Sequence, residues 1–223
     1  MKKQTPQLTR EQLEKNHLDA YGGPDRAHVS FTMIQKAINY SMTSFFTTGG
    51  IRGGKKKLDK FYPRSFNMGL SQKVFEATGG YADMRFGEDI DLSTRIMKAG
   101  FKTDLVEDAF VYHKRRTSFK QFFQQVYNSG IARINLYKLH PETLKLVHLL
   151  PAVFLCGTIV LLLLSFFSSY FLAPLILFVL IVLADSFFYY KNMTVSILSV
   201  FASLIQMFAY GSGFIAAFWK KGF

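Results

Sequence analysis

The last third of this 223-residue chain is almost free of charge, and this feature limits the folds that the chain can adopt. Apolar runs of about 20 residues match the hydrocarbon thickness of a bilayer. Three such runs predict a transmembrane region at 147–219 with two to three spans, at about 149–167, 170–190 and 195–218. The charged side chains from residue 147 onward are Asp185, Lys191, Lys220 and Lys221.

The third run has two interpretations. It contains Gln206 and a Gly-Ser-Gly triplet at 211–213, so it either spans the bilayer or kinks and lies partly in the interface. Lysines on both of its sides leave the positive-inside rule undecided. Asp185, near the end of the second run, is either a functional intramembrane acid or an interfacial one.

The polar part of the chain is strongly basic. Before residue 147 lie 24 of the 27 Lys and Arg and 14 of the 15 Asp and Glu side chains, and the whole chain carries a net charge of +12. This charge predicts attraction to anionic lipid head groups and to a phosphate-bearing substrate. Nucleic-acid binding is the alternative, but no nucleic-acid motif is present, so we expect no nucleic-acid partner.

The cysteine content and the N-terminus bear on the compartment. The chain has a single cysteine, Cys156, inside an apolar run, which excludes a disulfide framework and a CxxC metal site. The N-terminal segment is polar and lacks the apolar core of a signal peptide. We therefore expect the polar part to face the cytosol.

Glycine, proline and capping residues predict alternating helices and short strands. Ser71 and Ser118 are expected N-caps, and Pro141 is expected to end a helix. A glycine-rich basic segment at 47–65 lacks P-loop spacing and is either a solvated loop or one that closes over phosphate. Helices are predicted within the polar segment 1–20 and at 30–46, 72–78, 88–99 and 119–139, and strands at 66–70 and on both sides of 107–108.

Four acidic side chains fall within nine positions of this basic chain: Asp83, Glu88, Asp89 and Asp91. Acids at the start of a helix are stabilised by the helix dipole, which is one explanation of the cluster. A catalytic or binding site is the other. Asp91 and Arg95 are spaced i,i+4, which predicts an ion pair that braces the helix.

The stretch GGYADMRFGEDIDLSTRIMKAG, residues 79–100, resembles the C-terminal half of the catalytic domain of a family 2 glycosyltransferase. The resemblance covers roughly residues 20–138. The QxxRW signature of processive members is not met, because Asn128 and Ser129 stand in place of Arg and Trp, so processive polymer synthesis is not expected. The matching positions are Asn67, Gly69, Gly79, Gly80, Tyr81, Glu88, Asp89, Asp91, Leu92, Arg95, Gly100, His113, Gln124 and Gln125.

The resemblance implies an α/β fold, in which a partial GT-A-like domain with a mixed sheet and helices occupies residues 21–140 and an α-helical membrane region follows. It implies an inverting enzyme that transfers a sugar from a nucleotide-sugar donor to a cell-surface polysaccharide or lipid-linked acceptor. The expected location is the inner (plasma) membrane, with a multi-pass anchor and a cytoplasmic catalytic part.

The resemblance also implies roles for individual residues. Asp89 would be the base that takes the proton of the acceptor hydroxyl. His113 has a second interpretation, as a strand-end histidine beside a solvated basic face. The acceptor side would hold Glu88, Asn67 and Gly69, and the leaving diphosphate would face His113, Arg115, Arg116 and Gln125.

The nucleotide-binding half of the family's domain has no counterpart here. Family members hold a divalent metal, Mg²⁺ or Mn²⁺, through a DxD motif in that half, and the one DxD-shaped triplet in this chain, residues 89–91, already matches the acceptor-side motif. We therefore predict no metal ligand in this chain. We expect a truncated or split transferase that is inactive alone, with a separate chain as the candidate source of the missing half. The alternative is a catalytically incomplete membrane protein that acts as a binding or partner subunit.

Overall fold

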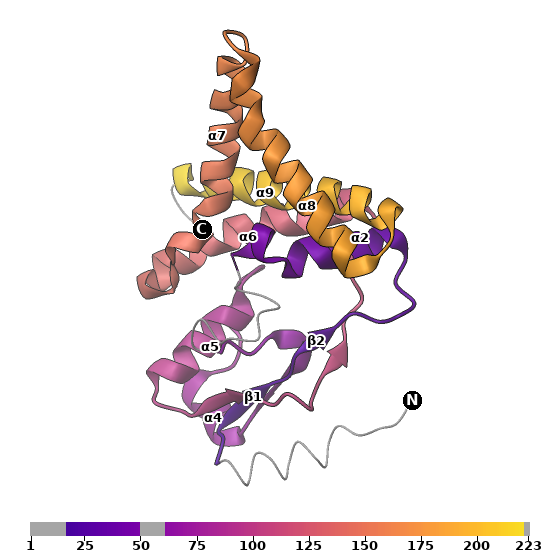
Figure 1. Cartoon of the computed structure of the whole chain (residues 1–223). Helices are drawn as coiled ribbons and strands as arrows, with labels where there is room; N and C mark the ends of the chain where they lie inside the picture. The colour runs from indigo at the N-terminus through magenta and orange to yellow at the C-terminus, as the bar shows by residue number, and fades with distance from the viewer. Residues whose placement is uncertain (1–16, 50–60, 221–223) are drawn as a thin grey trace. The chain divides into compact units, whose positions relative to one another are not determined.

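The computed structural model describes residues 17–49 and 61–220. Its contacts divide the chain into two compact units (Figure 1). We call residues 1–28 and 57–113 the sheet unit, and residues 29–56 and 114–223 the helical unit. The predicted N-terminal helix falls almost entirely, and the basic loop largely, outside the described residues.

The sheet unit contains two small sheets. Strand β1 (Ala20–Gly22) lies at the centre of the larger one, antiparallel to β3 (Met68–Leu70) and parallel to β4 (Thr103–Leu105). Strand β2 (Asp25–Arg26) pairs in parallel with β5 (Val111–Tyr112). The predicted mixed sheet is thus confirmed, and the two strands expected around residues 107–108 belong to different sheets.

Strand β3 is shorter than the predicted strand at 66–70. The chain enters it through a 3-10 turn, η1 (Ser65–Asn67), which the backbone N–H of Asn67 closes by donating to the Arg64 carbonyl at 2.9 Å. The Asn67 side chain donates to the Ala109 carbonyl at 2.6 Å. These bonds hold the residue in a turn, so strand pairing begins at Met68.

Two helices, α4 (Gln72–Thr78) and α5 (Glu88–Lys98), pack on the larger sheet. Ser71 caps α4 by accepting from the backbone N–H of Val74, as predicted. Gly79 ends the same helix in the left-handed region at φ 70°, where glycine is favoured. The buried side chains between the sheet and these helices are Ala20, Val74, Leu92 and Ile96.

The helical unit follows the predicted helices with two local differences. The expected helix at 30–46 breaks at Ser44, whose extended backbone ends α2 and whose side chain caps α3. Ser118 caps α6, but Gln121 bonds Thr117 rather than completing a capping box. The elements are α2 (Met33–Thr43), α3 (Phe45–Thr48), α6 (Phe119–Leu139), η2 (Pro141–Thr143), η3 (Leu146–His148), α7 (Leu150–Leu164), η4 (Ser169–Leu172), α8 (Ala173–Tyr190) and α9 (Met193–Trp219).

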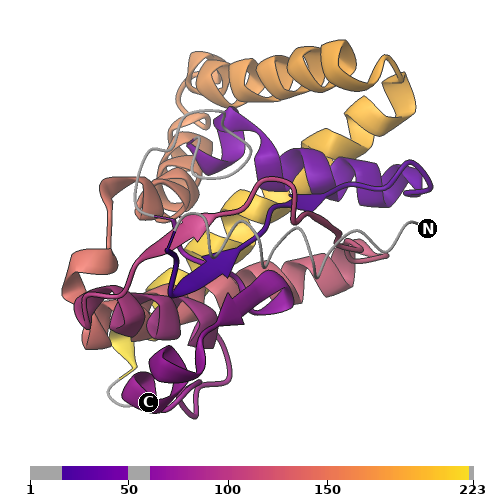
Figure 2. The ribbon, with the colours of Figure 1, turned by 90° about the horizontal axis from the view of Figure 1, so that it is seen from below.

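Helix α9 is the centre of the helical unit, because it packs against α2, α6, α7 and α8 (Figure 2). Glycines let α6 and α9 approach closely: a Cβ on Gly130 would lie 2.3 Å from the Tyr210 carbonyl oxygen, and one on Gly213 would lie 2.1 Å from that of Tyr127. Gly211 makes a similar approach to the Pro151 carbonyl at the start of α7.

Helix α2 is tied to the second apolar run by hydrogen bonds. Tyr40 Oη donates to the Asp185 carboxylate at 2.5 Å, and Tyr190 Oη donates to the Lys36 carbonyl at 3.0 Å. The Asp185 side chain thus joins α8 to α2.

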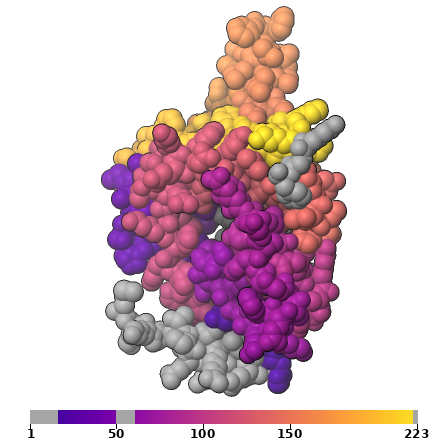
Figure 3. Space-filling model, turned by 180° about the vertical axis from the view of Figure 1, so that it is seen from behind, coloured from indigo at the N-terminus to yellow at the C-terminus, as the bar shows by residue number. Residues whose placement is uncertain are grey.

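Among the described residues, two helical segments are long and apolar enough to cross a membrane. They are Ser169–Tyr190, with a mean hydropathy of 2.5, and Met193–Trp219, with 1.7. The run predicted at 149–167 forms only the 15-residue helix Leu150–Leu164, about 22 Å long, because a turn begins at Ser165. Helix α7 is steeply inclined to α9, and α7 and α8 form a hairpin (Figure 1). The tip of this hairpin, drawn in orange, projects beyond α9 (Figure 3).

Candidate functional site

The acidic cluster occupies the start of α5. Gly87 precedes the helix at φ 88°, a left-handed conformation that reverses the chain without a side-chain penalty. Glu88, Asp89 and Asp91 then fall in the first turn, where the helix dipole favours their charge. The predicted helix start is confirmed.

Asp89 is held from two directions. Its Oδ1 accepts from the backbone N–H of Ile90 at 2.8 Å, and its Oδ2 lies 3.4 Å from Arg64 Nη1. The side chain of Asp89 is 14% exposed and that of Arg64 is 30% exposed, so the pair lies at a surface rather than in a core. A carboxylate in this position can meet a substrate hydroxyl and accept its proton.

The partner Arg64 was not predicted from the sequence, and a serine explains how it reaches Asp89. The hydroxyl of Ser93 is buried and donates to the Asp89 carbonyl at 2.7 Å and to the Pro63 carbonyl at 3.0 Å. The second bond fastens the segment before Arg64 to α5. The contact joins positions 25 residues apart, and no local sequence pattern signals it.

Tyr81 belongs to the same surface. Burial, followed by the charges of Asp89 and Glu88, raises the pKa of the Tyr81 phenol. The phenol therefore stays protonated, and its hydroxyl donates to Met68 Sδ at 3.7 Å beside the two carboxylates. Within the GGY motif, Tyr81 places its phenol beside the carboxylates. Gly80 forms the turn at φ 74°, and its carbonyl accepts from Arg95.

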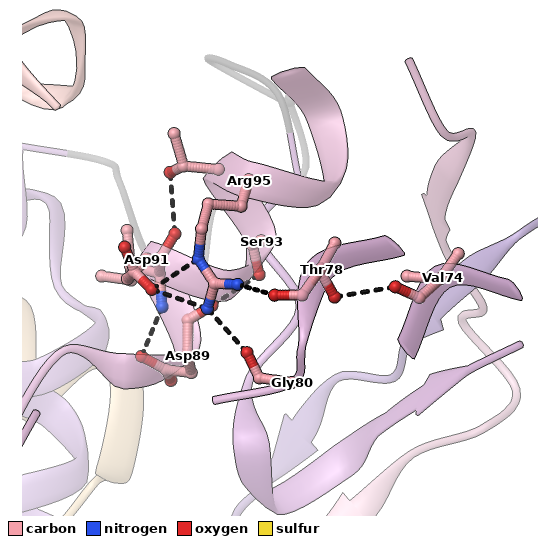
Figure 4. A network of polar contacts seen from close by, with 9 residues as sticks. Val74, Thr78, Gly80, Asp89, Asp91, Ser93 and Arg95 are labelled. Carbon is pink, nitrogen blue, oxygen red and sulfur yellow. Dashed lines mark hydrogen bonds and ion pairs between the residues drawn. The ribbon is translucent and has the colours of Figure 1, made fainter. Parts of the chain in front are cut away.

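Asp91 faces inward and pairs with Arg95, which confirms the predicted brace (Figure 4). The Asp91 carboxylate is 3% exposed and lies 2.8 Å from Arg95 Nη2. The same guanidinium donates to the carbonyls of Thr78 and Gly80, which end α4. The brace therefore fixes the GGY turn against the helix that carries Asp89.

Asn67 and Gly69, predicted for the acceptor side, both have structural partners. The amide of Asn67 donates to the Ala109 carbonyl. Gly69 lies under the ring of Tyr21, and a Cβ at Gly69 would come within 2.0 Å of that ring. Asn67 and Gly69 thus join β3 to its neighbours, and their role toward an acceptor stays a prediction.

The residues predicted to face the diphosphate divide between the units. His113, in the sheet unit, packs on Phe66 with ring centroids 4.5 Å apart and ring planes tilted by 34°. Arg115, in the helical unit, is 6% exposed and donates through Nε to the Asn39 side chain at 3.1 Å. Arg116 and Gln125 come together, since Arg116 Nε donates to Gln125 Oε1 at 3.0 Å.

The divalent metal that the sequence resemblance implies needs a set of carboxylate or imidazole ligands. Within residues 17–49 and 61–220, no three His, Cys, Asp or Glu side chains come together in a way that could hold a metal ion. The described part of the chain does not fit the metal, and we derive no step through it.

A comparison with known protein families finds a match. The family model described as "Glycosyl transferase family group 2" matches residues 65–215. The match includes the GGY turn, the whole of α5 and most of the helical unit. No curated protein matches the chain.

Proposed function

Because the chain belongs to glycosyl transferase family group 2, we propose that it takes part in the transfer of a sugar from a nucleotide-sugar donor, with Asp89 as the base. The observation that carries this proposal is the Asp89 carboxylate, partly exposed at the start of α5 and positioned by Arg64 and the Ile90 N–H. The surface around Asp89 supplies the acceptor side of the reaction.

The proposed reaction inverts the anomeric carbon. The acceptor oxygen forms a bond to that carbon while the bond to the diphosphate oxygen breaks, and the hydroxyl proton passes to Asp89. Glu88 and the Tyr81 hydroxyl, on the same surface, would orient the acceptor. His113, Arg116 and Gln125 stay predicted contacts of the leaving diphosphate, whose growing negative charge cations and hydrogen-bond donors stabilise. The Arg115 guanidinium is bonded to Asn39. We therefore propose that Arg115 has a positioning role on the diphosphate side of the site.

We further propose a GT-A-like arrangement for the catalytic domain and an inner-membrane location. The mixed sheet with α4 and α5 on it supports the first, and the helices that could cross a membrane support the second. The acceptor class that we propose is a cell-surface glycan or a lipid-linked glycan, and the catalytic surface would face the cytosol.

The test uses membranes of the native cells in which the chain is replaced by variants. The Asp89→Asn variant is expected to lose sugar transfer from labelled nucleotide sugars by about 100-fold or more, because an amide cannot accept the proton. Asp104→Asn, on the exposed middle of β4, is the matched control and should keep full transfer.

Two results would contradict the proposal. Turnover of Asp89→Asn near that of the natural chain would remove Asp89 as the base, provided that the variant is present in the membrane at the same level. Membranes that consume none of the labelled nucleotide sugars with the natural chain would instead favour the alternative, a binding or partner subunit.

A further inference from the structure

The helical unit contains an apolar groove in the corner between α7 and α9. Its volume is about 530 Å³, within the range of roughly 300–1,000 Å³ that is typical of small-molecule sites. Gly157 opens the α7 wall, because a Cβ there would meet no atom within 4 Å. Residues that line the groove include Leu149, Val153 and Gly157 on one side and Phe214, Phe218 and Trp219 on the other.

Cationic groups lie next to the end of the groove at which α7 begins. Lys145 and His148 belong to the turn directly before Leu149. Arg133, on α6, bonds the turn before that one, with Nη1 3.5 Å from the Thr143 carbonyl, and its charge acts on His148. Lys138 lies beside the other wall, since its Nζ donates to the carbonyl of Lys220, directly after Trp219. From residue 109 to 184 the sequence has a single acidic side chain, Glu142, so the local charge is positive.

Two of these groups, Arg133 and His148, carry side-chain hydrogen-bond donors next to the groove. The Nε atom of Arg133 is buried and finds no hydrogen-bond partner among the described residues. The Nδ1 atom of His148 accepts from the Lys145 backbone N–H at 3.0 Å. Burial and the nearby charges of Arg133 and Lys145 lower the His148 pKa to about 3, so at neutral pH its proton sits on Nε2 as a donor.

We propose that this corner binds a membrane lipid with a phosphate head group, whose chain lies in the α7–α9 groove and whose phosphate meets Arg133, Lys145 and His148. A soluble phosphate would use the cations but not the groove, and a zwitterionic lipid would fill the groove but gain less from the cations. Basic pockets beside apolar helices bind anionic lipid heads in this way. The proposal concerns binding and does not depend on sugar transfer.

Trp219, the chain's single tryptophan, reports directly on the groove, because it lines one wall and is 80% exposed. The experiment places the full chain in phosphatidylcholine vesicles that contain a brominated lipid. The brominated lipid is either phosphatidic acid or phosphatidylcholine, at equal mole fraction. Bromine quenches tryptophan on contact, so we expect stronger quenching by brominated phosphatidic acid. Equal quenching by the two lipids would overturn the proposal.

Variants test whether the preference for phosphatidic acid depends on the cations and on the groove. Lys145→Gln should lower the preference for phosphatidic acid about fivefold, the effect of about 1 kcal/mol for one cation near a membrane surface. Lys73→Gln, on the exposed face of α4, is the matched control and should change nothing. Gly157→Leu, which fills the groove, should reduce quenching by both lipids. An unchanged preference in Lys145→Gln would overturn the phosphate site.

Inorganic phosphate separates the two possible sources of the anion. Millimolar inorganic phosphate should not reduce the quenching by brominated phosphatidic acid, because it cannot occupy the groove. Full competition by inorganic phosphate would show that the cations serve a soluble anion and would overturn the assignment to a lipid. Circular dichroism of each variant, expected to match that of the natural chain, excludes unfolding as the cause.

Discussion

At the scale of single residues, two members of the acidic cluster face in opposite directions, Asp89 outward and Asp91 inward. Asp89 is partly exposed beside Arg64, whereas Asp91 is buried against Arg95, although two positions separate them in the sequence. The i,i+4 spacing of Asp91 and Arg95 was sufficient to predict their pairing, because both lie on one helix. The Arg64–Asp89 contact could not be predicted, since it depends on the buried hydroxyl of Ser93.

The Asp91–Arg95 brace gives a stability prediction. Arg95→Ala should lower the free energy of unfolding by about 3 kcal/mol, because it leaves the buried Asp91 carboxylate without its partner. Arg85→Ala, an exposed arginine in the loop before α5, should change it by less than about 0.5 kcal/mol. Chemical unfolding in detergent, followed by circular dichroism, measures both. Equal effects of the two variants would contradict the role of the brace.

The lowered pKa of His148 gives a pH prediction. The unfolded chain binds a proton at this imidazole below about pH 6.5, while the folded chain resists it until about pH 3, so stability falls as the pH falls through this interval. Between pH 7 and pH 5 the His148 contribution is about 2 kcal/mol. His148→Gln should show a smaller loss of thermal stability over that range. The same loss in both proteins would show that His148 does not contribute.

At the scale of elements, the predictions succeeded where a local signal exists. Ser71 and Ser118 cap the helices that they were expected to begin, and Gly79 ends the helix before the GGY turn. Apolar character alone misplaced the end of α7, because Phe166 and Phe167 continue the hydrophobic run beyond Leu164 while the backbone already turns. The break at Ser44 was missed for a similar reason, since apolar periodicity continues across it.

The close crossing of α6 and α9 gives a packing prediction. Gly213→Ala should destabilise the helical unit by about 1–3 kcal/mol, because the added methyl would meet the Tyr127 carbonyl and push the helices apart. Gly157→Ala, at a position with open space, is the matched control and should be neutral or stabilising. Thermal unfolding in detergent distinguishes the two. A neutral Gly213→Ala would mean that the helices separate without cost.

At the scale of the whole molecule, the chain combines a small α/β unit with a helical unit that contains the two segments apolar enough to cross a membrane. Composition was sufficient to locate the apolar helices, because charged side chains avoid apolar surroundings. It could not show that residues 29–49 and 114–146, which are polar in part, belong to the helical unit. That assignment depends on contacts with α9, which lies much later in the sequence.

Cys156 offers a test of membrane insertion that needs no engineered label site. It is exposed on α7, so in intact membranes a charged, impermeant maleimide should fail to label it, and labelling should appear after detergent is added. A cysteine placed at Ala82, exposed in the sheet unit, in a Cys156→Ser background should react without detergent in opened membranes. Rapid labelling of Cys156 without detergent, in membranes broken so that both faces are accessible, would contradict insertion of α7.

The packing of α2 on α9 has a consequence for synthesis of the chain. Ala37 and Ile38 are buried in a cluster that includes Phe122 on α6 and Ala202 and Ala209 on α9, so the apolar side of α2 is only partly covered until α9 leaves the ribosome. The 149 residues between Thr43 and Met193 take roughly 7–30 s to translate. During that interval the nascent chain exposes an apolar face, so early release or a shortened C-terminus would leave α2 open to chaperones and to aggregation.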